Sequence, residues 1–174
     1  MKRMRELLGA VMLSASVSSV VFAESATAVI HATAEGSTGS GTAAFTDTPQ
    51  GLHVVIRVGG VPAGKHAIHI HQYGDCGDRA AAAGGHFNPD NAPHGFLPHD
   101  GLAKAHPGDM GNIDVGADDA GALTLTLPGV TLSGGAYSVG GRAIVLHEHV
   151  DDFGQPTGNA GGRIGCGPIV LTKE

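Results

Sequence analysis

The sequence predicts an all-β fold, an antiparallel sandwich or barrel of eight short strands, on three observations. Apolar side chains occupy every second position from Leu52 to Val58 and again from Leu123 to Leu127, which is the period of a strand with one buried face. Clusters of Gly, Pro, Asp and Ser separate such segments, as turns between strands do. No stretch carries a helical stripe of useful length.

The expected strands follow one another from Thr27 onward, each a short apolar or β-branched segment between turn residues. In chain order they are Thr27–Ala34, Gly41–Asp47, Leu52–Val58, His66–Tyr73, Gly111–Gly116, Leu123–Leu127, Arg142–His149 and Gly167–Thr172. Two stretches, Gly74–Met110 and Val150–Ile164, fit no strand. Loops of this length inside a compact domain are usually functional.

Length and composition restrict the class of protein. The 174 residues suffice for one domain with one core, and glycine supplies 29 of them without a Gly-X-Y period, which excludes collagen. Ten Lys and Arg against 16 Asp and Glu give a net charge of −6, which argues against a nucleic-acid partner. Eleven His with only two Cys favour a histidine-built metal site over a zinc finger.

Residues 1–23 are predicted to be a secretory signal that precedes a single domain over residues 24–174. Three basic residues among the first five precede an apolar run from Leu7 to Phe22, and the small residue Ala23 follows. The run is short and Ser-rich for a membrane span, so no membrane partner is expected of the mature form, and a core helix is the alternative reading. Cleavage after Ala23 would remove three basic residues and one acid, changing the net charge from −6 to −8.

Export would place the protein in the periplasm or outside the cell, where a disulfide can persist. The chain has two cysteines, Cys76 and Cys166. A bridge between them is the expected state of an exported pair, with two unrelated buried thiols as the alternative.

Several of the histidines are grouped on two expected strands and in the first long loop. His69 and His71 lie two apart on an expected strand, so both imidazoles leave one face while Ile68 and Ile70 enter the core. His147 lies on another expected strand, and the first long loop carries His86, His94, His106 and Asp109. A single surface histidine is more often solvated than a ligand, but this grouping indicates metal binding. Imidazoles suit copper and zinc, and imidazoles with one carboxylate are a reasonable zinc set.

The order of these motifs resembles the copper/zinc superoxide dismutase family, in a bacterial, exported form. The motifs extend over most of the chain, from about Ala26 to Leu171, and are His69-Ile70-His71, Gly84-Gly85-His86-Phe87-Asn88-Pro89, His94, His106 with Asp109, His147-Glu148, Gly158 to Arg163, and Cys166-Gly167. The resemblance implies an eight-stranded antiparallel Greek-key barrel or sandwich. It also implies two long functional loops, a zinc and disulfide loop and an electrostatic loop.

The resemblance also implies a site with two metals. The copper ligands would be His69, His71, His86 and His147, and the zinc ligands would be His86, His94, His106 and Asp109, with His86 as a bridging imidazolate. Asp151 would link His69 to His94, and Thr157 would narrow the channel mouth. The resemblance pairs Cys76 with Cys166 and gives His66 a structural role, while His31, His53, His99 and His149 are expected to be solvated.

The implied activity is the dismutation of superoxide to oxygen and hydrogen peroxide. Copper would cycle between Cu(II) and Cu(I), zinc would be structural, and His86 and Arg163 would be catalytic, with Arg163 guiding the anion. The loop between His147 and Arg163 is shorter than in the animal enzymes and lacks their steering charges, for which Lys104 is a candidate replacement. Gly167–Leu171 could form the interface of a homodimer. Alternatively, this segment is only the last strand of the fold.

Two functions of other classes stay open on the sequence. One is a copper-handling or zinc-storage module on the same fold, which loss of a copper ligand or of Arg163 would favour. The other is a zinc hydrolase, which needs an open coordination position. The expected copper ligands and Arg163 are all present in the sequence, which does not favour the first. Four zinc ligands leave no open coordination position, which does not favour the second.

Overall fold

The computed structural model describes residues 23–34 and 38–172. The predicted signal lies outside the described residues except for Ala23, so it stays a prediction. Within the described residues, no helix combines the length and hydropathy required for a membrane crossing.

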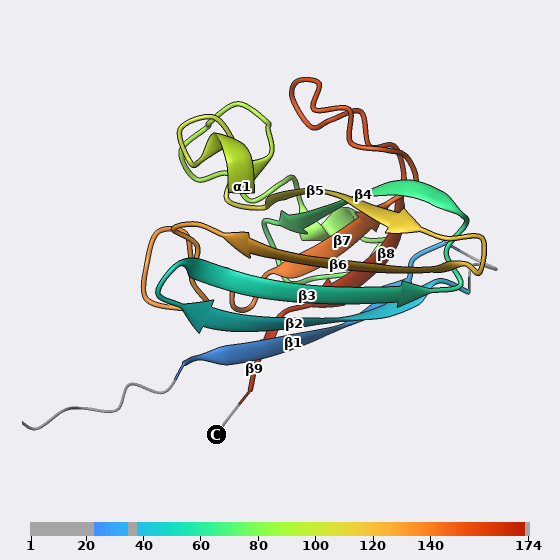
Figure 1. The fold of residues 1–174 in the computed structure, drawn as a ribbon, viewed down its shortest axis with the longest axis horizontal. Helices are drawn as coiled ribbons and strands as arrows, with labels where there is room; N and C mark the ends of the chain where they lie inside the picture. The colour runs from blue at the N-terminus through green and yellow to red at the C-terminus, as the bar shows by residue number, and fades with distance from the viewer. Residues whose placement is uncertain (1–22, 35–37, 173–174) are drawn as a thin grey trace, which may run out of the picture.

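The described chain folds into a closed antiparallel barrel with one additional short strand (Figure 1). The strands are β1 Ser25–Ala32, β2 Ser40–Thr48, β3 Gly51–Gly59, β4 Gly64–His71, β5 Asp109–Val115, β6 Ala120–Leu127, β7 Ala143–His147, β8 Arg163–Pro168 and β9 Val170–Leu171. Their order is β2-β3-β6-β5-β4-β7-β8-β1-β9, and pairing of β2 with β1 closes the barrel. The connections β3 to β4 and β6 to β7 pass over neighbouring strands, which makes the arrangement a Greek key. The predicted all-β Greek-key fold is confirmed.

The two alternating segments become β3 and β6, which pair along their whole length from Leu52 opposite Leu127 to Gly59 opposite Ala120. Two single turns interrupt the first long loop, a 3-10 turn at Ala81–Ala83 and helix α1 at Leu97–Asp100. Both are too short to show a periodic pattern in the sequence.

The predicted last strand, Gly167–Thr172, is wrong in its bounds. The chain instead forms β8 from Arg163 and, after a break at Ile169, the two-residue β9. The stretch Val150–Ile164, expected to fit no strand, is also wrong at its end, because β8 begins at Arg163 and lies between β7 and β1. A Cβ on Gly167 would lie 2.4 Å from the carbonyl oxygen of Val29. Glycine is therefore present because β1 approaches closely, not because the chain turns.

The barrel interior holds the main core, which includes Ile30, Phe45, Leu52, Ile56, Ile113 and Leu127. On β4, Ile68 and Ile70 join this core, so His69 and His71 lie on the outer face of the barrel. Outward-facing side chains are usually solvated, but both histidines are at most 1% exposed. Something must therefore cover this face.

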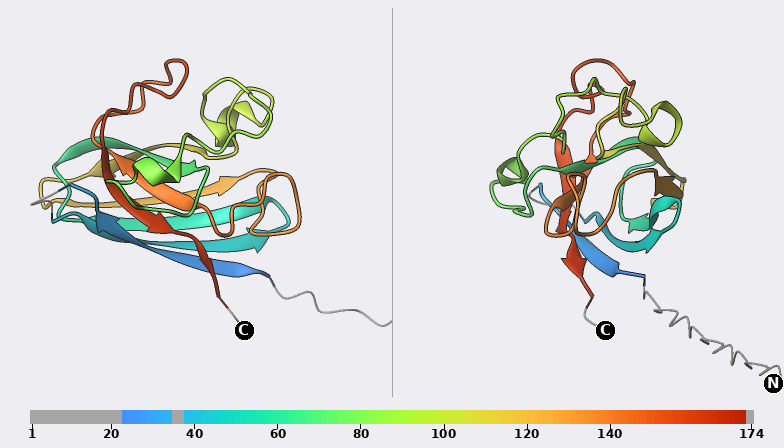
Figure 2. Two further views of the ribbon diagram at one scale, coloured as in Figure 1. Left: turned by 180° about the vertical axis from the view of Figure 1, so that it is seen from behind. Right: turned by 90° about the vertical axis from the view of Figure 1, so that its left-hand side faces the viewer.

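The two long loops provide that cover. The segment with α1 between β4 and β5, and the segment between β7 and β8, rise from the same side of the barrel (Figures 1 and 2). They enclose the outer face of β4 and β7, where the strand histidines lie.

Candidate metal centre

A first cluster consists of four imidazoles, from His69, His71, His86 and His147, with one ring nitrogen of each lying within 4.8 Å of the others. His69 and His71 come from β4, and His147 from the neighbouring β7. The Nε2 atoms of His71 and His147 are 3.2 Å apart, and the His69 and His86 ring centroids are 4.0 Å apart. The structure thus brings together the four residues expected to hold copper.

A second cluster surrounds Asp109, the first residue of β5. Its Oδ1 lies 3.1 Å from His86 Nδ1 and 3.0 Å from His106 Nδ1, and its Oδ2 lies 2.9 Å from His94 Nδ1. The backbone N–H groups of Gly95 and His106 donate to Oδ2 and fix the carboxylate. These are the four residues expected to hold zinc, although the second group of four whose potential ligand atoms all lie within 4.8 Å of one another includes His69 in place of His106.

Asp151 joins the two clusters. Its Oδ2 lies 2.8 Å from His69 Nε2 and its Oδ1 lies 2.9 Å from His94 Nε2. Because a carboxylate only accepts, each Nε2 carries a proton, and Nδ1 is the nitrogen that each ring has left for a metal. Both Nδ1 atoms are buried and make no hydrogen bond, although that of His94 faces Asp109 Oδ2 at 2.9 Å, and an unsatisfied buried polar atom costs about 1–3 kcal/mol. A metal ion on each side would remove that cost, so the residues fit a two-metal site.

Three histidines of the first cluster are in the form that binds metal. Burial is the largest influence and lowers the pKa of His71 to about 3, of His86 to about 4 and of His147 to about 2. They are therefore neutral at pH 7, as ligand imidazoles must be.

In the second cluster the pKa of His94 is shifted in the opposite direction, because two carboxylates lie beside it. Burial opposes protonation of His94, but the carboxylates of Asp109 and Asp151 outweigh it and raise the pKa of this imidazole to about 9. Without a metal its Nδ1 therefore also carries a proton, which a bound cation would displace. Burial also opposes ionisation of both carboxyls, yet the histidines beside them hold their pKa values well below the usual range. Both carboxylates are therefore ionised. The excess negative charge of this cluster suits a divalent cation.

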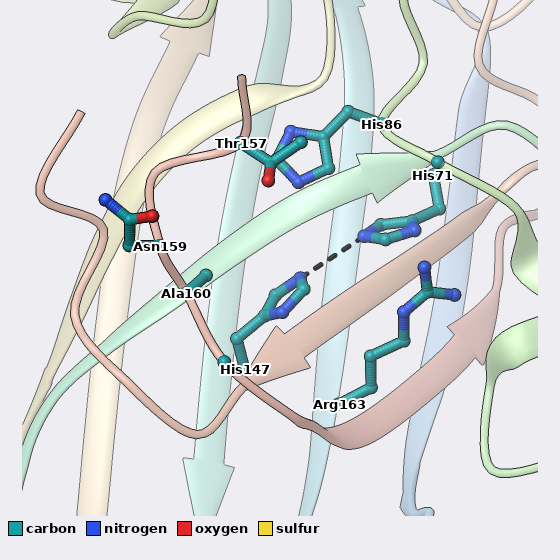
Figure 3. Close-up of a pocket in the computed structure, with 9 residues that line it drawn as sticks. His71, His86, His147, Thr157, Asn159, Ala160 and Arg163 are labelled. Atoms are coloured by element: carbon teal, nitrogen blue, oxygen red, sulfur yellow. Dashed lines mark hydrogen bonds between the residues drawn. The ribbon is translucent and has the colours of Figure 1, made fainter. Parts of the chain in front are cut away.

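The first cluster opens to a cavity of about 310 Å³. His71, His86 and His147 line its floor, and Thr157 and Arg163 also line it (Figure 3). The residues predicted to narrow the channel and to guide the anion thus line the same cavity as three of the predicted copper ligands.

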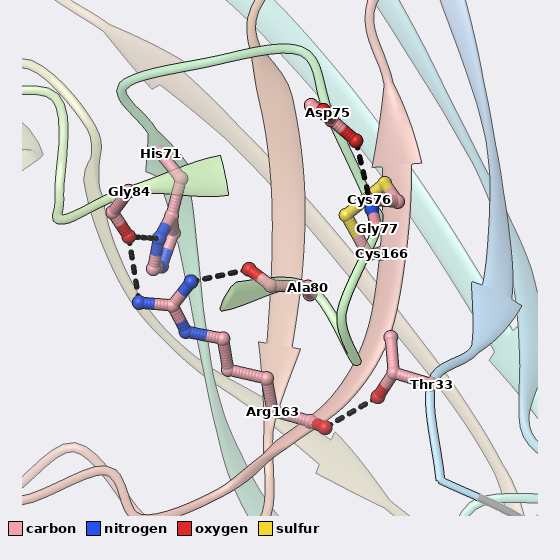
Figure 4. Close-up of a disulfide and its surroundings, with 9 residues drawn as sticks. All are labelled: Thr33, His71, Asp75, Cys76, Gly77, Ala80, Gly84, Arg163 and Cys166. Carbon is pink, nitrogen blue, oxygen red and sulfur yellow. Dashed lines mark hydrogen bonds between the residues drawn. A yellow bond between two sulfur atoms is a disulfide. The ribbon is translucent and has the colours of Figure 1, made fainter. Parts of the chain in front are cut away.

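Arg163 is fixed by backbone carbonyls of the first long loop. Its Nη1 donates to the Ala80 carbonyl, and its Nη2 donates to the Gly84 carbonyl at 2.6 Å (Figure 4). The same Gly84 oxygen accepts from His71 Nδ1 at 3.0 Å, which leaves His71 Nε2 as its ligand atom. Arg163 and His71 are therefore held against a shared acceptor.

The predicted disulfide is confirmed. Cys76 and Cys166 are bonded with an S–S length of 2.06 Å across 90 residues of sequence. The bond attaches the segment that carries the Ala80 and Gly84 carbonyls to β8, the strand that begins at Arg163. The disulfide and the guanidinium thus join the same two parts of the chain.

The remaining histidines lie away from both clusters. The ring nitrogens of His66 face the carbonyl oxygens of His147 and Pro62 at 2.9 and 2.8 Å, so His66 supports β7 and is not a ligand. His31, His99 and His149 are exposed, while His53 is half-buried near Thr126. Lys104 is exposed on the first long loop.

Sequence reasoning missed two carboxamides that contact the site, Asn112 and Gln155. Asn112 bonds both backbone groups of Asp151, and Gln155 bonds both backbone groups of His94. The only available signal was an Asn inside a strand, where Asn is depleted. Gln155 gave no signal, because its partner is 61 residues away in the sequence.

Comparison with known proteins points to one family. The family model described as copper/zinc superoxide dismutase matches residues 39–169. The chain is 40% identical over 141 residues to the extracellular Cu-Zn superoxide dismutase of Caenorhabditis elegans, covering 77% of this chain and 62% of that protein. It is 38% identical over 140 residues to the extracellular enzyme of Drosophila melanogaster, covering 75% of each.

Two further matches extend the comparison. Superoxide dismutase [Cu-Zn] 5 of Dictyostelium discoideum is 41% identical over 123 residues, covering 67% of this chain and 78% of that protein. Among solved structures, the clock protein EA4 superposes with a TM-score of 0.77 at 34% identity. That match covers 90% of this chain and all of the other.

Proposed function

The chain belongs to the copper/zinc superoxide dismutase family, and we propose that it converts superoxide to oxygen and hydrogen peroxide at the two joined clusters. The observation that carries the proposal is Asp151, which bonds His69 and His94 through Nε2 and leaves the buried Nδ1 of each, which makes no hydrogen bond, for a metal. A structural hydrogen-bond network would satisfy these atoms. A pair of metal ions accounts for both.

We assign the two clusters to different metals. Copper would be held by His69, His71, His86 and His147, and zinc by His86, His94, His106 and Asp109. Bound copper supplies the one-electron exchange of the reaction, because zinc has no redox change. His86 belongs to both sets: its Nδ1 faces Asp109, which leaves Nε2 for the first cluster, where this nitrogen would hold and release a proton.

Arg163 would bring the anionic substrate to the cavity. The protein carries a net negative charge, so attraction of superoxide needs a local positive charge at the opening. A unit charge attracts an anion at ~5 Å by about 3 kcal/mol at an effective dielectric near 20, before salt and desolvation reduce it. Thr157 lines the same cavity and would limit the size of what enters. Lys104, exposed on the first long loop, is the proposed second source of positive charge.

We also propose that residues 1–23 direct export and that residues 24–174 are the mature domain, acting in the periplasm or outside the cell. The disulfide supports this, as do the two relatives named extracellular. For a homodimer, the proposed surface lies along β1 and β9. There Val29 is 54%, Val170 61% and Leu171 41% exposed.

The experiment that tests the function combines metal content, a visible spectrum and a dismutation assay on purified protein. The proposal expects copper and zinc near one each per chain, a d–d band of Cu(II), and turnover of superoxide. Zinc alone without turnover would favour a storage module or a hydrolase instead.

Replacement of His147 by Ala separates the two clusters. His147 belongs to the first group of potential ligands and not to the second. His147→Ala should abolish turnover and retain zinc. Substantial remaining activity would show that His147 is not a copper ligand.

A further inference from the structure

Two loop segments meet at the hydrogen bond between Asp151 and His94, and neither belongs to a strand. His94 lies in the long loop before β5, and Asp151 lies in the loop after β7. Loop backbones fix side chains less accurately than strands do. The position of this hydrogen bond therefore depends on what holds the two backbones.

A carboxamide holds each of them. The amide Nδ2 of Asn112 donates to the Asp151 carbonyl at 3.0 Å, and its Oδ1 accepts from the Asp151 N–H at 2.7 Å. Gln155 contacts the backbone of His94 in the same way: its Nε2 donates to the His94 carbonyl at 2.8 Å, and its Oε1 accepts from the His94 N–H at 2.9 Å. One carboxamide side chain thus bonds both the N–H and the C=O of each of these two residues.

The two carboxamides connect the loops to different supports. Asn112 lies on β5, three residues after Asp109, so one strand carries both a proposed zinc ligand and the group that holds Asp151. Gln155 follows Asp151 by four residues in the same loop and reaches across to the other loop. The Asp151–His94 pair is thus fixed to the barrel on one side and across the loops on the other.

Packing leaves the pair little freedom. The Phe153 N–H donates to Asp151 Oδ1 at 2.9 Å. A Cβ on Gly158 would lie 1.9 Å from Asp151 Oδ1 and 2.7 Å from His94 Nε2, so the backbone of the loop lies directly over the hydrogen bond. With the carboxylate enclosed, a shift of either backbone is passed on to the imidazole.

From this geometry we propose that Gln155 and Asn112 are positioning residues, a pair of carboxamide clamps that set the orientation of His94 through its own peptide and through Asp151. The inference rests on the proposed role of His94 as a zinc ligand. Groups that orient a ligand from outside the coordination sphere typically change metal affinity 10–100-fold when lost. Both residues act on zinc retention, and neither touches the substrate.

The test measures zinc release from the full-length holoprotein to a chromogenic chelator, together with the visible spectrum of Co(II) in place of zinc. Gln155→Ala is the main variant because Gln155 is exposed and its loss should leave the barrel folded. It should release zinc at least tenfold faster than the wild type and change the Co(II) spectrum. The control is Gln50→Ala, since Gln50 is an exposed glutamine in the turn between β2 and β3, and it should match the wild type in both measurements.

Isosteric variants separate positioning from packing. Gln155→Glu and Asn112→Asp keep the acceptor oxygen and remove the donor to the peptide carbonyl, so both should also accelerate zinc release. In the double variant Asn112→Ala with Gln155→Ala, release should be slower than the product of the single effects predicts, because both act on one hydrogen bond.

Wild-type rates of zinc release in Gln155→Ala and Gln155→Glu would overturn the inference. So would independent, multiplicative effects of the two clamps. A wild-type protein that binds no zinc would instead contradict the proposed function. The two failures are therefore distinguishable.

Discussion

At the scale of single residues, hydrogen-bond partners decide which nitrogen of each imidazole is free for a metal. His69 and His94 give Nε2–H to Asp151, which leaves Nδ1 for a metal, whereas His71 gives Nδ1–H to the Gly84 carbonyl, which leaves Nε2 for a metal. Partners on the far side of each ring thus set the direction of its lone pair. The chemistry of the cluster depends on these contacts as much as on the presence of histidine.

Arg163→Ile should lower the rate constant for superoxide about tenfold or more. Loss of an attraction of about 1.4 kcal/mol or greater accounts for that factor. Zinc and copper content should stay unchanged because no ligand is altered, and Arg163→Lys should retain part of the rate. Stopped-flow decay of superoxide at several ionic strengths checks this, and added salt should slow the wild type more than Arg163→Ile.

The matched control for charge is Arg57→Ile, because Arg57 is exposed on β3 and does not line the cavity. Its rate should stay close to that of the wild type. Equal rates for Arg163→Ile and the wild type at low salt would remove Arg163 from the catalytic route.

The metal-free protein should lose stability as pH falls from about 6.5 toward 5. Burial lowers the pKa of His71 to about 3 and of His147 to about 2, so the unfolded chain binds protons in this range and the fold does not. Each such group costs on the order of 2 kcal/mol at pH 5. Urea unfolding of chelator-treated protein at pH 7 and pH 5 measures the loss. His147→Gln should lose less stability over this range, and equal unfolding free energies of the wild type at the two pH values would contradict the prediction.

At the scale of elements, the alternation of side chains along β4 gives its two faces different roles. Ile68 and Ile70 pack in the barrel while His69 and His71 face outward beneath the loops. The register of β4 against β5 shifts between Ala67 and His69, and its pairing with β7 takes over at Ile68. His69 therefore pairs with both β5 and β7, and His71 pairs with β7, so both ligands project from a strand held in a sheet.

Gly167→Ala should destabilise the barrel by about 1–3 kcal/mol. The added Cβ would lie 2.4 Å from the Val29 carbonyl oxygen on β1, and overpacking of this kind forces backbone shifts. Thermal or urea unfolding measures the change. Gly59→Ala, where a Cβ meets nothing within 4 Å, is the control and should change stability little. Equal stability of the two variants would show that β1 and β8 can separate without cost.

At the scale of the whole molecule, the barrel supplies a rigid wall and the two long loops complete the site on its outer face. Cys76–Cys166, the clamps of Asn112 and Gln155, and the bonds of Arg163 to the first loop all join segments that are distant in sequence. The site is therefore a property of the closed assembly of loops on the barrel. No single segment carries it.

Replacement of Cys76 and Cys166 by Ser should lower the free energy of unfolding by about 4–5 kcal/mol, the loop-closure value for a bridge across this many residues. Turnover should also fall, because Cys76 anchors the segment whose carbonyls hold Arg163. Urea unfolding and the dismutation assay measure the two effects. Full activity in a destabilised variant would show that the guanidinium is held without the disulfide.

The sequence alone determined the all-β class, the strands at Leu52–Val58 and Leu123–Leu127, and the histidines and Asp109 as candidate metal ligands, which the family resemblance divided into two sets. Period-two patterning and local spacing record these features, since they depend on neighbours along the chain. The resemblance to a known family added the disulfide pairing and the role of Asp151.

Only the tertiary structure decided the start of β8 at Arg163, the covered outer face of β4, and the clamps of Asn112 and Gln155. Each depends on contacts between segments that are far apart in the sequence. A glycine that marks a turn cannot be told from one that admits a neighbouring strand, and a carboxamide facing solvent cannot be told from one that satisfies a distant peptide. Composition and periodicity do not identify such partners, because the two residues become neighbours only when the barrel closes and the loops fold over it.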